Sequence, residues 1–128
     1  VQYDSLDVKP SFKEYKKCVF LTDGWYEWIR LENGSSNPVF IHLNNDLFYF
    51  AAIYNNTGGA IVTIDAQASL KNIHHRQPMV LNSEEVDEWL YSEKRVIFSR
   101  IIEVISSYEV SRYVNSPRNN DTKCIHKV

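Results

Sequence analysis

Short runs of β-branched and aromatic residues recur along the first half of the chain, and turn-forming residues separate them. Runs of this length and composition are typical of β-strands. The runs predicted as strands are Cys18–Thr22, Trp25–Arg30, Val39–Leu43, Leu47–Tyr54 and Ala60–Ile64. Cys18–Thr22 is an apolar run, which favours a buried strand. Val39–Leu43 and Leu47–Tyr54 flank the turn sequence NND, which predicts a β-hairpin.

Helix signals are fewer. Ser83 precedes EEVDEWL, whose acidic first turn suits the positive helix N-terminus, so a helix capped by Ser83 is predicted. Short helices are also predicted from Lys9 and over Gln67–Ile73, whereas Tyr108–Val114 alternates like a strand. Met79–Leu81 is predicted as extended, Arg95–Ile105 fits either helix or strand, and the tail NSPRNNDTKCIHKV is predicted to be mostly loop. The 128 residues suit one α+β domain with a modest core.

The charge balance gives no general sign of nucleic-acid binding. The formal net charge is −2, so binding to DNA would need a local basic patch rather than a global field. Lys9, Lys13, Lys16 and Lys17 would share one broad face of a helix and form such a patch, although this pattern more often marks a lysine face that only meets solvent.

Cysteine usage and hydropathy indicate a cytosolic protein. The apolar runs are too short to cross a bilayer, and the first residues do not resemble a signal peptide. Cys18 and Cys124 are therefore expected to be reduced thiols. Cys18 lies in an apolar run and Cys124 in a loose tail, so neither is expected to be a nucleophile.

The sequence DGWYEW places the carboxylate of Glu27 among aromatic residues. On a strand, Trp25 and Glu27 share one face, while Tyr26 and Trp28 share the other. Glu27 is then either a residue at the rim of a half-buried strand or an acid whose pKa is raised by its apolar neighbours.

The second cluster is His74-His75-Arg76. Adjacent histidines on an extended segment point in opposite directions, so a shared metal ion is disfavoured, and no HExxH or CxxC spacing supports one. The alternatives are a general acid or base at one histidine with Arg76 holding an anion, or a surface loop before Pro78.

Read in order, six blocks resemble the SOS-response-associated peptidase (SRAP) family. The blocks are KPSF, KKCVFLTDGWYEW, FYFAAIY, IVTIDAQASLKNIHHRQPMVL, EEVDEWL and YEVSRYVNSP. The resemblance implies an α+β fold with a mainly antiparallel, barrel-like β-sheet and short flanking helices. It also implies a monomer that is cytoplasmic and nucleoid-associated, with no metal and no cofactor.

The resemblance further implies binding to single-stranded DNA and capture of abasic sites. In this family an N-terminal cysteine closes a thiazolidine with the aldehyde of the sugar, and autopeptidase activity exposes that cysteine. Glu27 and His74 match the catalytic residues. Arg76 matches a phosphate-binding arginine and Thr63 a pocket position, and Lys13 and Lys16 are added as DNA-binding candidates.

Departures from the family leave alternatives open. The family's first third, with its cysteine, is expected to be missing from a single domain over residues 1–128 that starts at Val1, and His75 stands where the family usually has Asp. Whether the chain as given is an enzyme therefore stays open. A non-catalytic module for single-stranded nucleic acid is the alternative, and a metal-dependent hydrolase using His74 and His75 is the third hypothesis.

Overall fold

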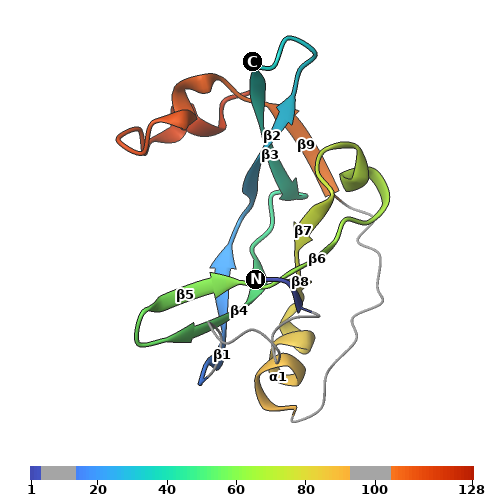
Figure 1. Ribbon diagram of the computed structural model, residues 1–128, viewed down its shortest axis with the longest axis vertical. Helices are drawn as coiled ribbons and strands as arrows, with labels where there is room; N and C mark the ends of the chain where they lie inside the picture. Colours follow the sequence, from blue (N-terminus) through green and yellow to red (C-terminus); the bar gives the residue numbers. More distant parts are fainter. Residues whose placement is uncertain (4–13, 93–104) are drawn as a thin grey trace.

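A computed structural model describes residues 1–3, 14–92 and 105–128 of the chain. The first residues of the helix predicted from Lys9, including Lys13, and nearly all of the ambiguous stretch 95–105 lie outside these residues. The helical face predicted to continue through Lys16 and Lys17 is wrong, because both residues belong to a β-strand that pairs with Ile53 and Tyr54. In the described part, antiparallel strands dominate and are grouped into three sheets (Figure 1).

The largest sheet is built around one central strand. β4 pairs from Phe48 to Tyr54 with β1 on one side, and on the other side with β5 at one end and β8 at the other. The strands are β1 (Lys16–Thr22), β4 (Phe48–Asn55), β5 (Gly58–Ile61) and β8 (Val80–Leu81). β4 is central because it has a continuous run of apolar residues, FYFAAI, which packs on both faces of the sheet.

The second sheet, of order β2-β3-β9, carries Glu27, and a two-stranded ribbon of β6 and β7 forms the third sheet. Their strands are β2 (Trp25–Arg30), β3 (Ser36–Leu43), β9 (Ile105–Glu109), β6 (Thr63–Asp65) and β7 (Arg76–Pro78). The helices are α1 (Ser83–Tyr91) and the 3-10 turns η3 (Ala68–Asn72), η4 (Arg112–Asn115) and η5 (Thr122–Ile125).

Three backbone hydrogen bonds join the largest sheet to the ribbon. Ala51 N–H donates to Met79 O, Met79 N–H to Val62 O, and Val62 N–H to Ala51 O, at 2.8–2.9 Å. Val62 separates β5 from β6, and Met79 separates β7 from β8. The two chain segments therefore leave β4 together at this point and pair with each other, which carries β6 and β7 towards β2.

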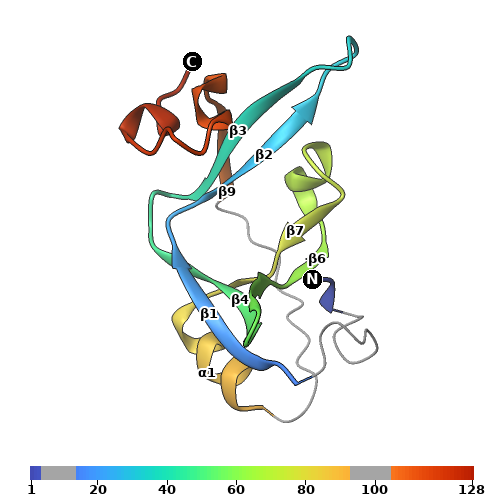
Figure 2. The same cartoon turned by 60° about the vertical axis from the view of Figure 1, so that its left-hand side comes forward.

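Two apolar clusters hold the sheets together. The first joins Trp25, Val39, Ile41, Phe48, Phe50, Ala66, Leu70 and Val80. The second lies under α1 and joins Ala51, Ile53, Val62, Met79, Leu81 and Trp89. α1 contacts β1 and β4 at the end of the molecule opposite the C-terminal segment (Figure 2).

The structure confirms the predicted α+β class with mainly antiparallel strands and short helices. The described strands do not close into a barrel. The predicted strand Trp25–Arg30 and the short helix after Gln67 are present, and Val80–Leu81 is extended as expected. The continuous strand predicted over Ala60–Ile64 is interrupted at Val62, where the pairing partner changes.

The predicted hairpin is wrong. Asn44 and Asn45 do form a tight turn with positive φ, 51° and 59°, but β3 and β4 then diverge into different sheets. The reason is that β3 already has β2 and β9 on its two edges, so no edge remains for β4.

Three smaller predictions also need correction. β1 is a strand but not a buried one, since Leu21 is 60% exposed at the end of the sheet order. The strand predicted over Tyr108–Val114 ends at Glu109, because the Ser111 side chain accepts from Tyr113 N–H and begins η4. The helix cap is Asn82, one residue before Ser83, and it forms a capping box with Glu85.

Candidate acid and imidazole site

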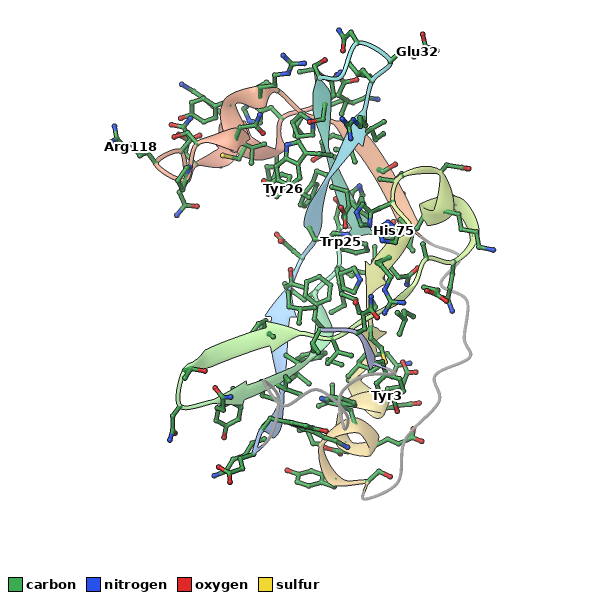
Figure 3. The ribbon with its side chains drawn as sticks, in the orientation of Figure 1. Tyr3, Trp25, Tyr26, Glu32, His75 and Arg118 are labelled. Carbon is green, nitrogen blue, oxygen red and sulfur yellow. The ribbon has the colours of Figure 1, made fainter. Side chains whose placement is uncertain are left out.

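β2 presents two different faces, as the alternation of DGWYEW predicts. The Trp25 ring is buried and meets the rings of Phe48 and Phe50 edge-on, with centroids 6.1 and 5.7 Å away. Glu27 follows on the same face. Figure 3 shows Trp25 and His75 on the side of β2 that faces β7, with Tyr26 on the side of the C-terminal segment.

Close packing against β3 requires a glycine at position 24, just before Trp25. A Cβ at this position would lie 2.6 Å from Ile41 O and 2.4 Å from Cζ of Phe40. Since a backbone carbonyl cannot move aside cheaply, only glycine lets β2 begin this close to β3. Thr22 Oγ1 accepts from Gly24 N–H at 3.2 Å and fixes the same turn.

The other face of β2 is held by the C-terminal segment. Tyr26 Oη donates to Cys124 O at 3.2 Å, and Trp28 Nε1 donates to Asn115 Oδ1 at 2.8 Å. Cys124 is buried, so the prediction of a loose tail around it is wrong. This support of β2 was missed from the sequence, because contacts between residues almost 100 positions apart leave no local pattern.

The Glu27 carboxyl group is half-buried, and burial raises its pKa. The positive charges of His74 and His75 and a side-chain hydrogen bond from Trp25 lower the same pKa. They offset the effect of burial only in part, so the pKa stays raised. Both imidazoles therefore act on this carboxylate, although the histidines are almost 50 residues away in sequence. The acid and the imidazole proposed from the sequence lie within electrostatic range of each other.

His74 is fixed by backbone contacts. Its Nδ1 accepts a hydrogen bond from Arg76 N–H at 3.1 Å. The same Nδ1 lies 3.2 Å from Arg76 O, so the backbone of Arg76 fixes the orientation of the imidazole ring through both of its polar groups.

The prediction that the two histidines point in opposite directions is wrong. Their rings stack with centroids 4.5 Å apart. The segment between η3 and β7 is not extended at His74, whose backbone N–H donates to Leu70 O at 3.0 Å.

Arg76 and Thr63 lie side by side on β7 and β6. The Arg76 guanidinium donates to Asp65 Oδ1 at 2.6 Å and to Thr63 O at 2.8 Å. Arg76 Nε is buried without a hydrogen-bond partner. Thr63 also donates its N–H to Val1 O at 2.7 Å, so the first residues run beside this pair.

Lys16 is exposed at the start of β1, at the far end of the largest sheet (Figure 1).

Neither cysteine is placed as a reactive thiol. Burial raises the pKa of the Cys18 thiol, which disfavours the thiolate. Cys124 Sγ donates to Asn119 O. Across the three described stretches, no three His, Cys, Asp or Glu side chains gather into a group that could hold a metal ion. The same stretches contain no helix of the length and apolarity needed to cross a membrane.

The pKa of Glu27 leads to a prediction about stability. Because the folded-state pKa lies above the ordinary value of 4.5, the contribution of Glu27 to stability is complete below pH 4.5 and is lost as the pH rises through the raised pKa. Glu27→Gln removes this titration. We therefore expect the variant to gain stability relative to the wild type as the pH rises, measured by urea unfolding at pH 4 and pH 8. An equal difference in unfolding free energy at both pH values would contradict the raised pKa.

Comparison with known proteins gives a consistent family match. The sequence model described as "SOS response associated peptidase (SRAP)" matches residues 1–117. The chain is 31% identical to "Abasic site processing protein YoqW" of Bacillus subtilis, over 95% of this chain and 63% of that protein. It is 29% identical to "Abasic site processing protein HMCES" of Gallus gallus, over 95% of this chain and 48% of that protein.

A solved structure shares the fold. A protein from Bacteroides thetaiotaomicron, determined by X-ray crystallography, superimposes with a TM-score of 0.79 at 24% identity, over all of this chain and 65% of that one. The chain thus spans less than two thirds of the length of the relatives described above.

Proposed function

Because the chain belongs to the SOS response associated peptidase (SRAP) family, we propose that it is the acid–base part of an abasic-site processing protein. Relatives whose names state abasic site processing support the substrate. The observation that carries the proposal is Glu27, a half-buried carboxylic acid with a raised pKa that feels the charge of His74. Such a group can donate a proton to a reacting oxygen and later take one back.

In the proposed reaction, Glu27 gives its proton to the ring oxygen of the abasic sugar as the bond from that oxygen to the anomeric carbon breaks. The anomeric hydroxyl gives up its proton to His74, which leaves the open-chain aldehyde. His74 also stabilises the charge that develops on oxygen. An N-terminal cysteine then condenses its amine with the aldehyde and releases water, and its thiol adds to the resulting C=N bond to close a thiazolidine. In the same proposal, autopeptidase activity releases that cysteine as a new N-terminus.

The thiol in this scheme comes from outside the 128 residues. Cys124 is buried and the Cys18 thiolate is disfavoured. The path of the chain supports this assignment. Val1 O accepts a hydrogen bond from Thr63 N–H, and the Thr63 hydroxyl accepts one from the Arg76 guanidinium. Residues joined to Val1 would therefore enter beside β6 and β7, close to the His74 segment.

We propose that single-stranded DNA binds across Arg76, Thr63, Lys13 and Lys16. The unpartnered Arg76 Nε is a donor that a phosphate could use after a small movement, while Asp65, whose side chain is 93% exposed, already occupies one edge of the guanidinium. We further propose a monomer that is cytoplasmic and associated with the nucleoid.

Salt dependence tests the DNA surface. We expect the affinity for a single-stranded oligonucleotide to fall with salt, and charge reversal of Lys13, Lys16 and Arg76 to Glu to abolish measurable binding at physiological salt. At low salt, the slope of log affinity against log salt should fall by roughly 2, since each single-stranded phosphate contact contributes about 0.7. Lys127→Glu, a reversal at the C-terminal end, is the control and should change little. An unchanged slope in the triple variant would rule out this surface.

The second candidate function is a non-catalytic module for single-stranded nucleic acid. The observation that favours it is that neither cysteine of this chain is placed to react. The two functions differ in one result, since only the first gives a DNA band that survives denaturation.

A further inference from the structure

The stacked imidazole of His75 has no role in the reaction proposed above. Its ring lies 4.5 Å from the His74 ring with an angle of 27° between the planes, and its side chain is exposed. The backbone holds it there, because Ala66 N–H donates to His75 O at 3.0 Å. The ring therefore covers one face of His74 from the solvent side.

His74 is then fixed in two ways. The contacts of Nδ1 with the backbone N–H and O of Arg76 fix the orientation of the ring, and the His75 ring limits rotation of the imidazole plane. A rotation that broke the stack would also move Nε2 away from its present direction.

Charge is the second property that His75 brings to the site. The titratable groups on the neighbouring elements are Glu27 on β2, His74 beside it, Arg76 on β7, Asp65 on β6 and Lys71 at the end of η3. Arg76 is paired with Asp65, whereas the histidines act on Glu27, in the order His74 and then His75. A positive charge on His75 thus acts against the effect of burial on the pKa of that carboxylate.

We infer that His75 is a positioning residue that holds the His74 ring in place and supplies a second positive charge to the Glu27 carboxylate. The inference rests on the proposed function only for its purpose. That purpose is to let Glu27 give up its proton as readily as it takes one back. An acid buried without such charges would keep its proton and complete only half of the cycle.

Two substitutions separate the ring from the charge. His75→Phe keeps an aromatic ring over His74 but removes the charge, while His75→Lys keeps a charge and removes the ring. The readout is the titration of the Glu27 carboxyl carbon by NMR in this chain, without DNA. His126→Asn, in the exposed tail, is the matched control and should leave the titration unchanged.

We expect His75→Phe to raise the titration midpoint of Glu27 by roughly 0.5 pH units, as for one unit charge removed from a few ångströms away in partly hydrated surroundings. His75→Lys should titrate close to the wild type. A midpoint that does not move in His75→Phe, or that moves equally in both variants, would overturn the inference.

The NMR titration of Glu27 does not depend on the proposed function, and a cross-linking assay separates the two. If the Glu27 midpoint moves as expected but no form of the protein binds or cross-links abasic DNA, the positioning role stands and the proposed function is wrong. If cross-linking occurs and its pH profile is the same with Phe or His at position 75, the positioning role is wrong and the function stands.

Discussion

Glu27→Gln is expected to slow covalent capture of abasic single-stranded DNA by about 10²–10⁴-fold, the range that one positioned general acid or base contributes. Gln has nearly the shape of Glu and can still accept from Trp25, but it has no proton to exchange. The loss should therefore appear in the rate of cross-linking and not in the affinity for DNA.

The assay compares this chain with the same chain preceded by the residues encoded upstream of Val1. Covalent product is read on a denaturing gel with an oligonucleotide that contains one abasic site. Glu32→Gln is the control, because Glu32 is an exposed carboxylate in the loop after β2 (Figure 3). Two outcomes would refute the mechanism: a covalent band from the 128 residues alone, or equal cross-linking rates in Glu27→Gln and the wild type.

Trp89→Ala is expected to lower the free energy of unfolding by about 3–5 kcal/mol, the usual cost of emptying a tryptophan site in a core. Trp89 is 1% exposed and lies in the cluster between α1 and the largest sheet. Its Nε1 donates to Cys18 O at 2.9 Å, and Lys17 Nζ lies 4.7 Å from its ring. One side chain thus joins α1 to β1 by packing, a hydrogen bond and a cation–π contact.

Urea unfolding measures this effect, and Tyr91→Ala in the same helix is the matched control. Tyr91 is 77% exposed, so its loss should change stability by less than about 0.5 kcal/mol. A loss below about 1 kcal/mol for Trp89→Ala would mean that α1 is not anchored through this residue. Equal losses in both variants would point to helix propensity instead.

The local structure of this protein follows from its sequence. Alternation in DGWYEW determines which side chains share a face of β2, and the structure keeps Trp25 buried with Tyr26 opposite. Acidic residues after a polar cap place α1 to within one residue of the prediction. Both signals act over a few residues, and so they can be read from composition and period alone.

Strand pairing was decided by the tertiary structure. The NND turn predicts a hairpin, but β3 pairs with β2 and with β9 from the far end of the chain, which leaves β4 to form another sheet. The two histidines were likewise expected to diverge. Instead their rings stack, and the histidines are held by a hydrogen bond from His74 N–H to Leu70 O and by hydrogen bonds from the N–H groups of Ala66 and Arg76.

The sequence by itself determined the α+β class, the faces of β2 and the residue types that can exchange protons. Only the tertiary structure decided that the Glu27 acid and the imidazoles act on one another and that the C-terminal segment supports β2 from behind. The physical reason is that backbone preferences depend on neighbouring residues, whereas the pKa of a carboxyl group depends on whatever the fold brings near it.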